Sequence, residues 1–204
     1  MSKLETNTID TISGTNTLQV GDGNVATINL GKSGDTINIP SGATITNSGT
    51  ANNFGGANTP TFSAKSTSNQ TGLSSGGWTK IQFDTATFNV GSNYDTTNDK
   101  FVAPSDGKYF FTASLKINSA GGSATLLGTG CRFSINGTTA GDNVNFIGNG
   151  AMSAMSATNS MILNLTANQY VEVYAYYQDN GGGSGSVTGS GDKSTQFYGC
   201  KLIS

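Results

Sequence analysis

The residues that could perform acid–base chemistry are few in this sequence. Its 204 residues include no histidine and two glutamates, Glu5 and Glu172. General acid–base catalysis needs a positioned group that exchanges a proton near the working pH, and histidine and glutamate are the usual choices. Any such role would fall on aspartates, and we therefore expect that this chain is not an enzyme.

Two aspartates, Asp95 and Asp99, lie four residues apart in the stretch YDTTNDK. With Asn98 they offer the oxygen ligands that calcium prefers, and a carboxylate pair is also the machinery of polysaccharide hydrolysis. The same spacing is typical of a turn in which aspartate side chains accept hydrogen bonds from nearby backbone amides. A structural turn is the favoured interpretation, with a calcium site and a polysaccharide depolymerase as alternatives.

Two features could contact a receptor. Trp78, the only tryptophan, could stack on a sugar ring or fill the edge of a β-sandwich. The glycine-rich run from Asp179 to Asp192 predicts a long, solvent-facing loop. As a contact loop it would use Asp179, Asn180 and Asp192, and the alternative is a passive spacer.

Composition excludes several classes of partner. Charged residues make up 11% of the chain and the net charge is −2, so the basic surface that binds nucleic acid or anionic lipid is missing. No apolar run has the length of a signal peptide or a membrane span, so we expect synthesis in a cytoplasm. Cys131 and Cys200 are expected to be free thiols in the core.

The region from Thr8 to Thr50 contains a short repeat. Pairs of apolar residues separated by one position recur about every nine residues, each followed by a glycine or polar turn: Leu18 with Val20, Ile28 with Leu30, Ile37 with Ile39, and Ala43 with Ile45. So short a unit cannot enclose its own core, and repeats bury their apolar face by stacking. We predict a trimeric β-stalk over residues 8–50, and a disordered linker is the alternative.

Flanking segments complete the organisation. Residues 1–7 are expected to attach the stalk to another protein. Residues 51–60, which are rich in glycine and proline, are expected to form a hinge.

Residues 61–204 are predicted to form an antiparallel all-β sandwich or barrel of eight to ten strands, of the jelly-roll type. The expected strands are TFSAKST, TKIQFDTATFNV, KFVAP, GKYFFTASLKIN, GCRFSING, NVNFIG, NSMILNL, QYVEVYAYYQ and TQFYGCKLIS.

The strand QYVEVYAYYQ has two apolar faces. Val171, Val173, Ala175 and Tyr177 fall on one face, whereas Tyr170, Tyr174 and Tyr176 fall on the other. Because a sandwich strand ordinarily buries one face, the tyrosine face predicts a subunit contact. The alternative is a loop-covered surface of a monomer.

The order of motifs over residues 60–204 resembles the globular head of complement subcomponents and adiponectin. The family shows Phe-Ser-Ala, a Tyr-Asp turn, Pro-x-x-Gly-x-Tyr-x-Phe and a final Phe-x-Gly; the matching residues are Phe62, Ser63, Ala64, Tyr94, Asp95, Phe101, Pro104, Gly107, Tyr109, Phe111, Phe197 and Gly199. Asp99 and Lys100 replace the family's Thr-Gly, and Ser119 to Asn159 matches poorly. The resemblance implies a jelly roll related to tumour necrosis factor, a tight homotrimer, and binding without catalysis.

The N-terminal repeats are similar to the fibre shafts of phages that infect marine bacteria. The combined expectation is a homotrimeric virion fibre or spike protein, made in the bacterial cytoplasm, whose head recognises a host surface glycan or protein. Its N-terminus would bind other virion proteins, and no cofactor is expected unless calcium binds at Asp95, Asn98 and Asp99. The alternative is a structural protein that decorates the capsid or cements the tail.

Overall fold

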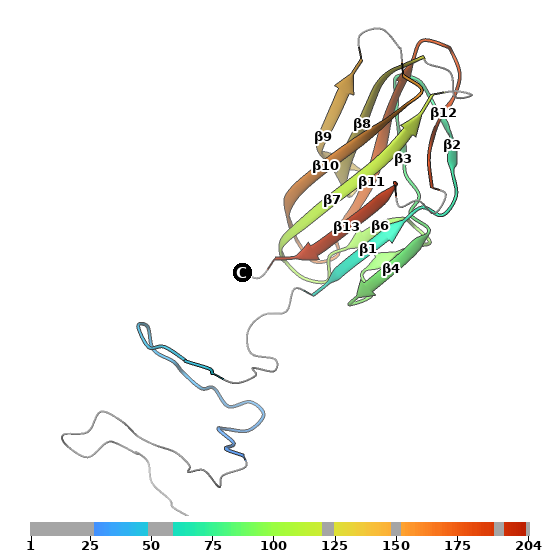
Figure 1. The fold of residues 1–204 in the computed structure, drawn as a ribbon. Helices are drawn as coiled ribbons and strands as arrows, with labels where there is room; N and C mark the ends of the chain where they lie inside the picture. Colours follow the sequence, from blue (N-terminus) through green and yellow to red (C-terminus); the bar gives the residue numbers. More distant parts are fainter. Residues whose placement is uncertain (1–26, 49–58, 120–124, 148–151, 190–193, 203–204) are drawn as a thin grey trace, which may run out of the picture. The chain divides into compact units, whose positions relative to one another are not determined.

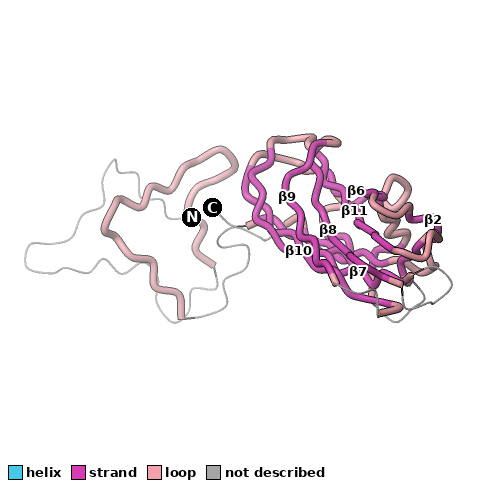
Figure 2. The backbone as a smooth tube through the Cα atoms, turned by 90° about the horizontal axis from the view of Figure 1, so that it is seen from above, coloured by secondary structure: helices cyan, strands magenta, loops and turns pink. Residues whose placement is uncertain are grey.

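The structure, a computed structural model, describes residues 27–48, 59–119, 125–147, 152–189 and 194–202. The chain divides into two units, Met1–Ala51 and Asn52–Ser204. The attachment segment predicted at residues 1–7 and most of the hinge predicted at 51–60 lie outside the described residues. Every regular element in the described ranges is a strand (Figure 2). None of these residues belongs to a helix that could cross a membrane.

The described repeats, residues 27–48, form extended chain with two similar turns. The amide of Asp35 donates to the carbonyl of Lys32 over 3.0 Å, and the amide of Ala43 donates to that of Pro40 over 3.1 Å. Each turn has a glycine of positive φ, Gly34 or Gly42, at its third position, as a type II turn requires. The predicted glycine corners are therefore present, whereas residues 27–48 of the single chain form no strand.

The second unit is a sandwich of two antiparallel sheets (Figure 1). Sheet A has the order β2-β12-β7-β13-β1-β4. Strands β12 and β13 pair with successive parts of one edge of β7, and β10 pairs with its other edge. Sheet B has the order β5-β6-β11-β8-β9, with β3 also paired to β11. The strands are β1 (Thr61–Lys65), β2 (Gln70–Leu73), β3 (Gly77–Lys80), β4 (Thr85–Val90), β5 (Tyr94–Asp95), β6 (Lys100–Val102), β7 (Gly107–Asn118), β8 (Leu126–Ile135), β9 (Thr138–Phe146), β10 (Ala154–Leu165), β11 (Tyr170–Asp179), β12 (Gly185–Val187) and β13 (Gln196–Lys201).

An aromatic cluster fills the core between the sheets. The Phe62 ring lies 4.8 Å from Tyr94, 5.3 Å from Phe101 and 4.9 Å from Phe197, measured between centroids. Gly199 leaves the necessary space, because a Cβ atom there would stand 2.6 Å from ring carbons of both Phe62 and Phe111. The Phe-x-Gly spacing of the last strand is thus a packing requirement.

Three differences from the predicted strands have physical causes. The predicted strand 79–90 is two strands, because β3 pairs in sheet B and β4 in sheet A, so residues 81–84 cross between the layers. The gap between the predicted strands GCRFSING and NVNFIG is shorter than their limits imply: Asn136 and Gly137 alone, both with positive φ, connect β8 to β9. The short strands β2, β5 and β12 were not predicted, since each is too brief or too rich in glycine to show periodicity.

Candidate functional site

Asp95 and Asp99 act on different parts of the backbone. Asp95 Oδ1 accepts hydrogen bonds from the amides of Thr97 (2.9 Å) and Asn98 (3.0 Å), and its Oδ2 accepts one from the Asn98 side chain at 2.7 Å. The Asn98 side chain is the main cause that holds the pKa of Asp95 below its usual range, followed by the amide of Asn98. This is the geometry of a structural turn.

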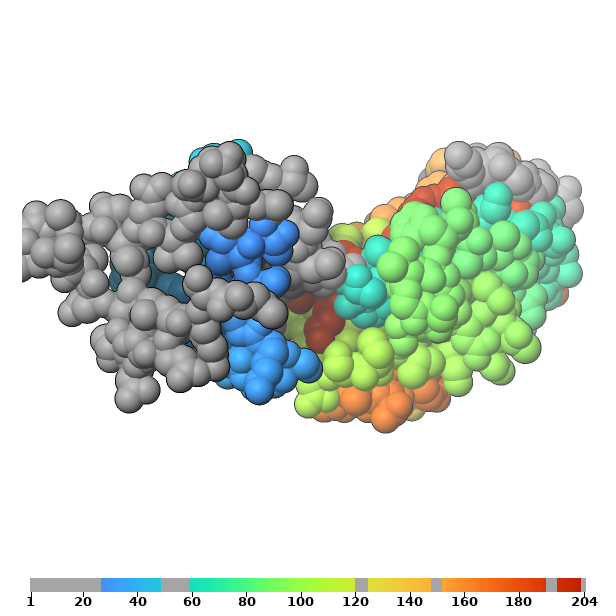
Figure 3. Space-filling model, turned by 90° about the horizontal axis from the view of Figure 1, so that it is seen from below, coloured from blue at the N-terminus to red at the C-terminus, as the bar shows by residue number. Residues whose placement is uncertain are grey.

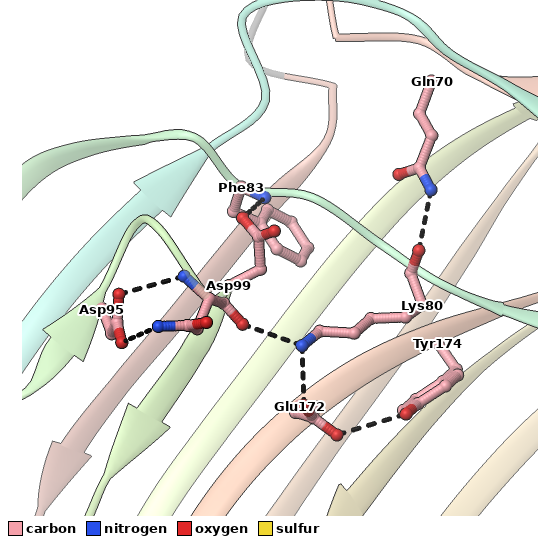
Figure 4. Close-up of polar contacts among 8 residues, drawn as sticks. Gln70, Lys80, Phe83, Asp95, Asp99, Glu172 and Tyr174 are labelled. Carbon is pink, nitrogen blue, oxygen red and sulfur yellow. Dashed lines mark hydrogen bonds and ion pairs between the residues drawn. The ribbon is translucent and has the colours of Figure 1, made fainter.

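The Asp99 carboxylate turns toward the core, where its Oδ1 accepts the amide of Phe83 at 2.8 Å (Figure 4). Its partial burial raises the pKa of Asp99, against the lowering effect of that hydrogen bond. Within the described ranges, no group of three or more His, Cys, Asp or Glu residues could hold a metal ion. Calcium at Asp95, Asn98 and Asp99 stays a prediction, and the arrangement favours the structural interpretation.

The outer face of sheet B carries the three tyrosines predicted from β11. Burial alternates as expected, since Val171, Val173, Ala175 and Tyr177 are buried and Tyr170, Tyr174 and Tyr176 are half-buried. Each tyrosine already has a partner within the chain. Lys100 Nζ lies 4.8 Å from the Tyr170 ring, the Tyr174 hydroxyl donates to Glu172 at 3.2 Å, and the Tyr176 hydroxyl to Gln178 at 2.8 Å.

Glu172 is the centre of a polar network on this face (Figure 4). Lys80 Nζ contacts its Oε1 at 2.6 Å and also donates to the carbonyl of Asn98 at 2.8 Å. Burial raises the pKa of the Tyr174 hydroxyl, and the neighbouring Glu172 charge raises it further. The network binds β3 to β11 and to the turn before β6, so it positions the neighbouring aromatic residues.

Trp78 lies on β3 opposite Tyr176, with 5.3 Å between ring centroids. The guanidinium of Arg132, the only arginine of the chain, lies 3.8 Å from the centre of the Trp78 ring. Arg132 also forms a salt bridge of 2.7 Å with Asp142 on β9. Sequence reasoning missed Arg132 and Asp142, because only the strand pairing places β3 and β8 on the two sides of β11, with β9 next to β8.

A pocket of about 120 Å³ opens beside this cluster; it is lined by Trp78, Arg132, Ser134, Gly137, Thr139 and Tyr174. Three of these residues, Ser134, Thr139 and Tyr174, carry hydroxyl groups, and two, Trp78 and Tyr174, are aromatic. Gly137, at the end of the β8–β9 hairpin, contributes no side chain. The arrangement can bind a small polar molecule, and it has no nucleophile paired with a base.

The glycine-rich segment after β11 is less free than predicted. Asp179 is only 8% exposed, and its carboxylate accepts hydrogen bonds from the Thr125 hydroxyl and the Gly181 amide. Strand β12 lies within this segment, and a Cβ atom on Gly185 would stand 2.5 Å from the Tyr177 ring. Asp179 is therefore directed inward and is poorly placed for a receptor contact. Asn180 is exposed, and Asp192 lies outside the described residues.

The outer face of sheet A bears a row of five residues, called the exposed row below, in which Val90, Phe110 and Ile162 are exposed and Thr61 and Cys200 are half-buried. The strand registers place its members side by side across five strands: Val90, Thr61, Cys200, Phe110 and Ile162. Phe88, which opens the next row, is also exposed. The row lies at the end of the head where β1 begins and β13 finishes, and the space-filling view shows the teal of β1 beside the dark red of the last described residues there (Figure 3).

Both cysteines are free, as expected, but the predicted core position is confirmed for Cys131 and wrong for Cys200. Cys131 is buried in the core, where burial raises the pKa of its thiol to about 12. Cys200 is half-buried and belongs to the exposed row on sheet A.

Comparison with known proteins places these features in a family. Residues 61–201 match the family described as C1q domain, which confirms the predicted resemblance of the head and its jelly-roll fold. No curated protein matches the chain. The match does not include the repeats, whose likeness to phage fibre shafts stays a prediction.

Two solved structures are similar to this chain. The globular domain of zebrafish complement 1qA protein is 10% identical, over 69% of this chain and 94% of that one, with a TM-score of 0.47. Murine APRIL, in its structure at pH 5.0, is 11% identical over 70% of this chain and 98% of that one, with a TM-score of 0.52. At 11% identity the likeness to murine APRIL concerns the fold alone.

Proposed function

This chain belongs to the C1q domain family, and we propose that it is a homotrimeric, non-catalytic binding protein that forms a virion fibre or spike. Domains of this family commonly form homotrimers. In the proposal, three heads associate through sheet A, the repeats associate into a stalk, and the assembled heads recognise a host surface glycan or protein. The proposal requires no cofactor.

The exposed row on sheet A is the observation that carries the proposal. Ile162 is 61% exposed in the single chain, and with Phe110, Val90 and Phe88 it forms an apolar surface that neighbouring copies could bury. Contiguous apolar patches of this kind mark interaction sites on otherwise soluble proteins. Because the β11 tyrosines already have partners within the chain, sheet A is a better subunit interface than Tyr170, Tyr174 and Tyr176.

The repeats support the same assembly. The aliphatic residues of the described repeats are 46–68% exposed in the single chain: Ile28, Leu30, Ile37, Ile39 and Ile45. Their burial against two other copies would provide the hydrophobic stabilisation that one chain lacks. The similarity of these repeats to phage fibre shafts is the basis for proposing a virion, with residues 1–7 as the docking segment.

Binding of fluorescently labelled full-length protein to a panel of bacterial strains tests recognition. We expect saturable binding to at least one strain and none after removal of the surface glycan or protein receptor. A folded trimer that binds no strain, and that antibodies locate over the whole capsid of a purified virion, would instead establish a decoration protein.

A further inference from the structure

We propose that the pocket on the outer face of sheet B binds one edge of a neutral sugar residue. The pocket, lined by Trp78, Arg132, Ser134, Gly137, Thr139 and Tyr174, is the cavity introduced above. This inference rests on the proposed function, which it deepens by assigning the contact site and the chemical class of its ligand. Four observations carry it: an unpartnered hydroxyl, a neutral donor–acceptor pair, an aromatic wall and a fitting volume.

The first observation concerns Ser134 on β8. Its hydroxyl is buried, at 3% residue exposure, and has no hydrogen-bond partner among the described residues. A buried hydroxyl without a partner is unfavourable, and native proteins contain few of them. Ser134 lines the pocket, so a polar ligand would supply the missing partner. Thr129, the other such hydroxyl, lies on the same strand but points to the core side.

The second observation is the pairing of Arg132 with Asp142. Arg132 donates two hydrogen bonds, from Nε and Nη2, to Oδ2 of Asp142 at 3.2 and 2.7 Å. Within the described ranges, Nη1 of Arg132 and Oδ1 of Asp142 keep free hydrogen-bonding capacity. A vicinal diol fits such a pair, because one hydroxyl accepts from the guanidinium while its neighbour donates to the carboxylate.

The paired charges around the pocket favour a neutral ligand over an acidic one. The positive charge of Arg132 is balanced by Asp142, and that of the nearby Lys80 by Glu172. A ligand carboxylate would therefore gain no net attraction and would lie close to Asp142. The hydroxyls of Ser134, Thr139 and Tyr174 add further partners that suit an uncharged polyol.

The aromatic wall and the volume fit one edge of a sugar ring. Trp78 and Tyr174 offer apolar surface for the C–H groups of a pyranose, and the stacked guanidinium of Arg132 fixes the Trp78 ring. A volume of about 120 Å³ is several times the share of one water molecule, about 30 Å³. A pocket of this size therefore holds two or three hydroxyl groups of a sugar. One such pocket would bind weakly, and the three copies in a trimer would supply avidity.

Trp78 makes the test direct, because the only tryptophan of the chain forms part of the pocket. Full-length protein is titrated with the methyl glycosides of glucose, galactose and mannose, and with methyl glucuronide, while tryptophan emission is recorded. We expect at least one neutral glycoside to change the emission saturably, with a Kd on the order of 1 mM, and the glucuronide to bind more weakly than the best neutral sugar.

Variants assign the effect to the pocket. Ser134→Ala, which removes an unsatisfied hydroxyl and should fold, is expected to weaken binding between about twofold and tenfold. Asp142→Asn, a second variant of the same shape, is expected to weaken it as well. Thr129→Val is the matched control, because it removes the other unpartnered hydroxyl of β8, and its affinity should equal that of the native protein.

Three results would overturn this assignment: no emission change with any of the neutral glycosides, glucuronide binding as tight as the best of them, or equal affinities of Ser134→Ala and Thr129→Val. Cell binding separates the inference from the proposed function. If Ser134→Ala binds cells as well as native protein does, the receptor site lies elsewhere while recognition stands. If the glycoside binds but no cell is bound, the pocket stands while the proposed function falls.

Discussion

At the scale of single residues, the chemical type of a side chain predicts its role less well than its hydrogen-bond partners in the structure do. Asp95 and Asp99 could be proposed from the sequence as a metal or catalytic pair, but each carboxylate accepts backbone amides of a different segment. Trp78 was identified from the sequence, whereas Arg132, Asp142 and Ser134 were not. They come from two strands that are brought together with β3 only in the folded sandwich, and no spacing along the chain indicates that meeting.

The two aspartates should affect acid stability with opposite signs. The pKa of Asp95 is lowered from its ordinary value of 3.8, so its contribution to stability is present above that value and is lost as the pH falls through the lowered one. The pKa of Asp99 is raised from the same value, so its contribution is greatest in acid and is lost as the pH rises through the raised value. Asp95→Asn should therefore flatten the fall in the free energy of unfolding below about pH 4.

Urea denaturation of the native protein and of Asp95→Asn between pH 2 and pH 7 measures this effect. Asp99→Asn serves as the comparison. The native protein should lose stability as Asp99 ionises above pH 3.8, the ordinary aspartate pKa, and the variant should not show this loss. Identical pH profiles for native protein and Asp95→Asn would show that the turn does not depend on the Asp95 charge.

At the scale of elements, periodicity predicted the strands that are long and buried on one face. The alternation of β11 and the limits of GKYFFTASLKIN were evident because Val, Ile, Phe and Tyr recur at every second position. Strand β12 was missed, since its one glycine, Gly185, is required by the close approach of the Tyr177 ring and not by strand propensity. Likewise, the crossing at residues 81–84 depends on which sheet each half of the segment joins.

The Phe-x-Gly motif of β13 yields a packing prediction. Gly199→Ala places a Cβ atom 2.6 Å from the rings of Phe62 and Phe111, in a core whose aromatic rings are tightly interlocked. We expect a loss of about 1–3 kcal/mol in the free energy of unfolding, as is usual for overpacked cores. Gly77→Ala on β3 is the control, because its Cβ would make only ordinary contacts. Equal denaturation midpoints for the two variants would contradict the packing argument.

At the scale of the whole molecule, the account depends on what covers sheet A. Cys200 lies within the exposed row, between Thr61 and Phe110, and provides a probe of that surface. If three copies bury the row, Cys200 should react slowly with a thiol reagent in concentrated native protein and faster when dilution dissociates the trimer. Mass spectrometry of alkylated peptides measures both thiols, with the buried Cys131 as the unreactive reference.

Rapid alkylation of Cys200 at every protein concentration would show that sheet A is open to solvent. Cys131 should remain unmodified throughout, since it is fully buried and its thiol pKa is about 12. Modification of Cys131 would instead indicate unfolding, so the two thiols distinguish dissociation from loss of the fold.

Sedimentation equilibrium of the full-length protein tests the central claim most directly. We predict a mass three times the 20.8 kDa of one chain, and a single-chain mass for Ile162→Asp, which places a charge in the apolar row of sheet A. Phe146→Ser, which removes a side chain 68% exposed on sheet B, should remain trimeric. A native protein that sediments as a folded single chain, or an Ile162→Asp variant that stays trimeric, would contradict the account.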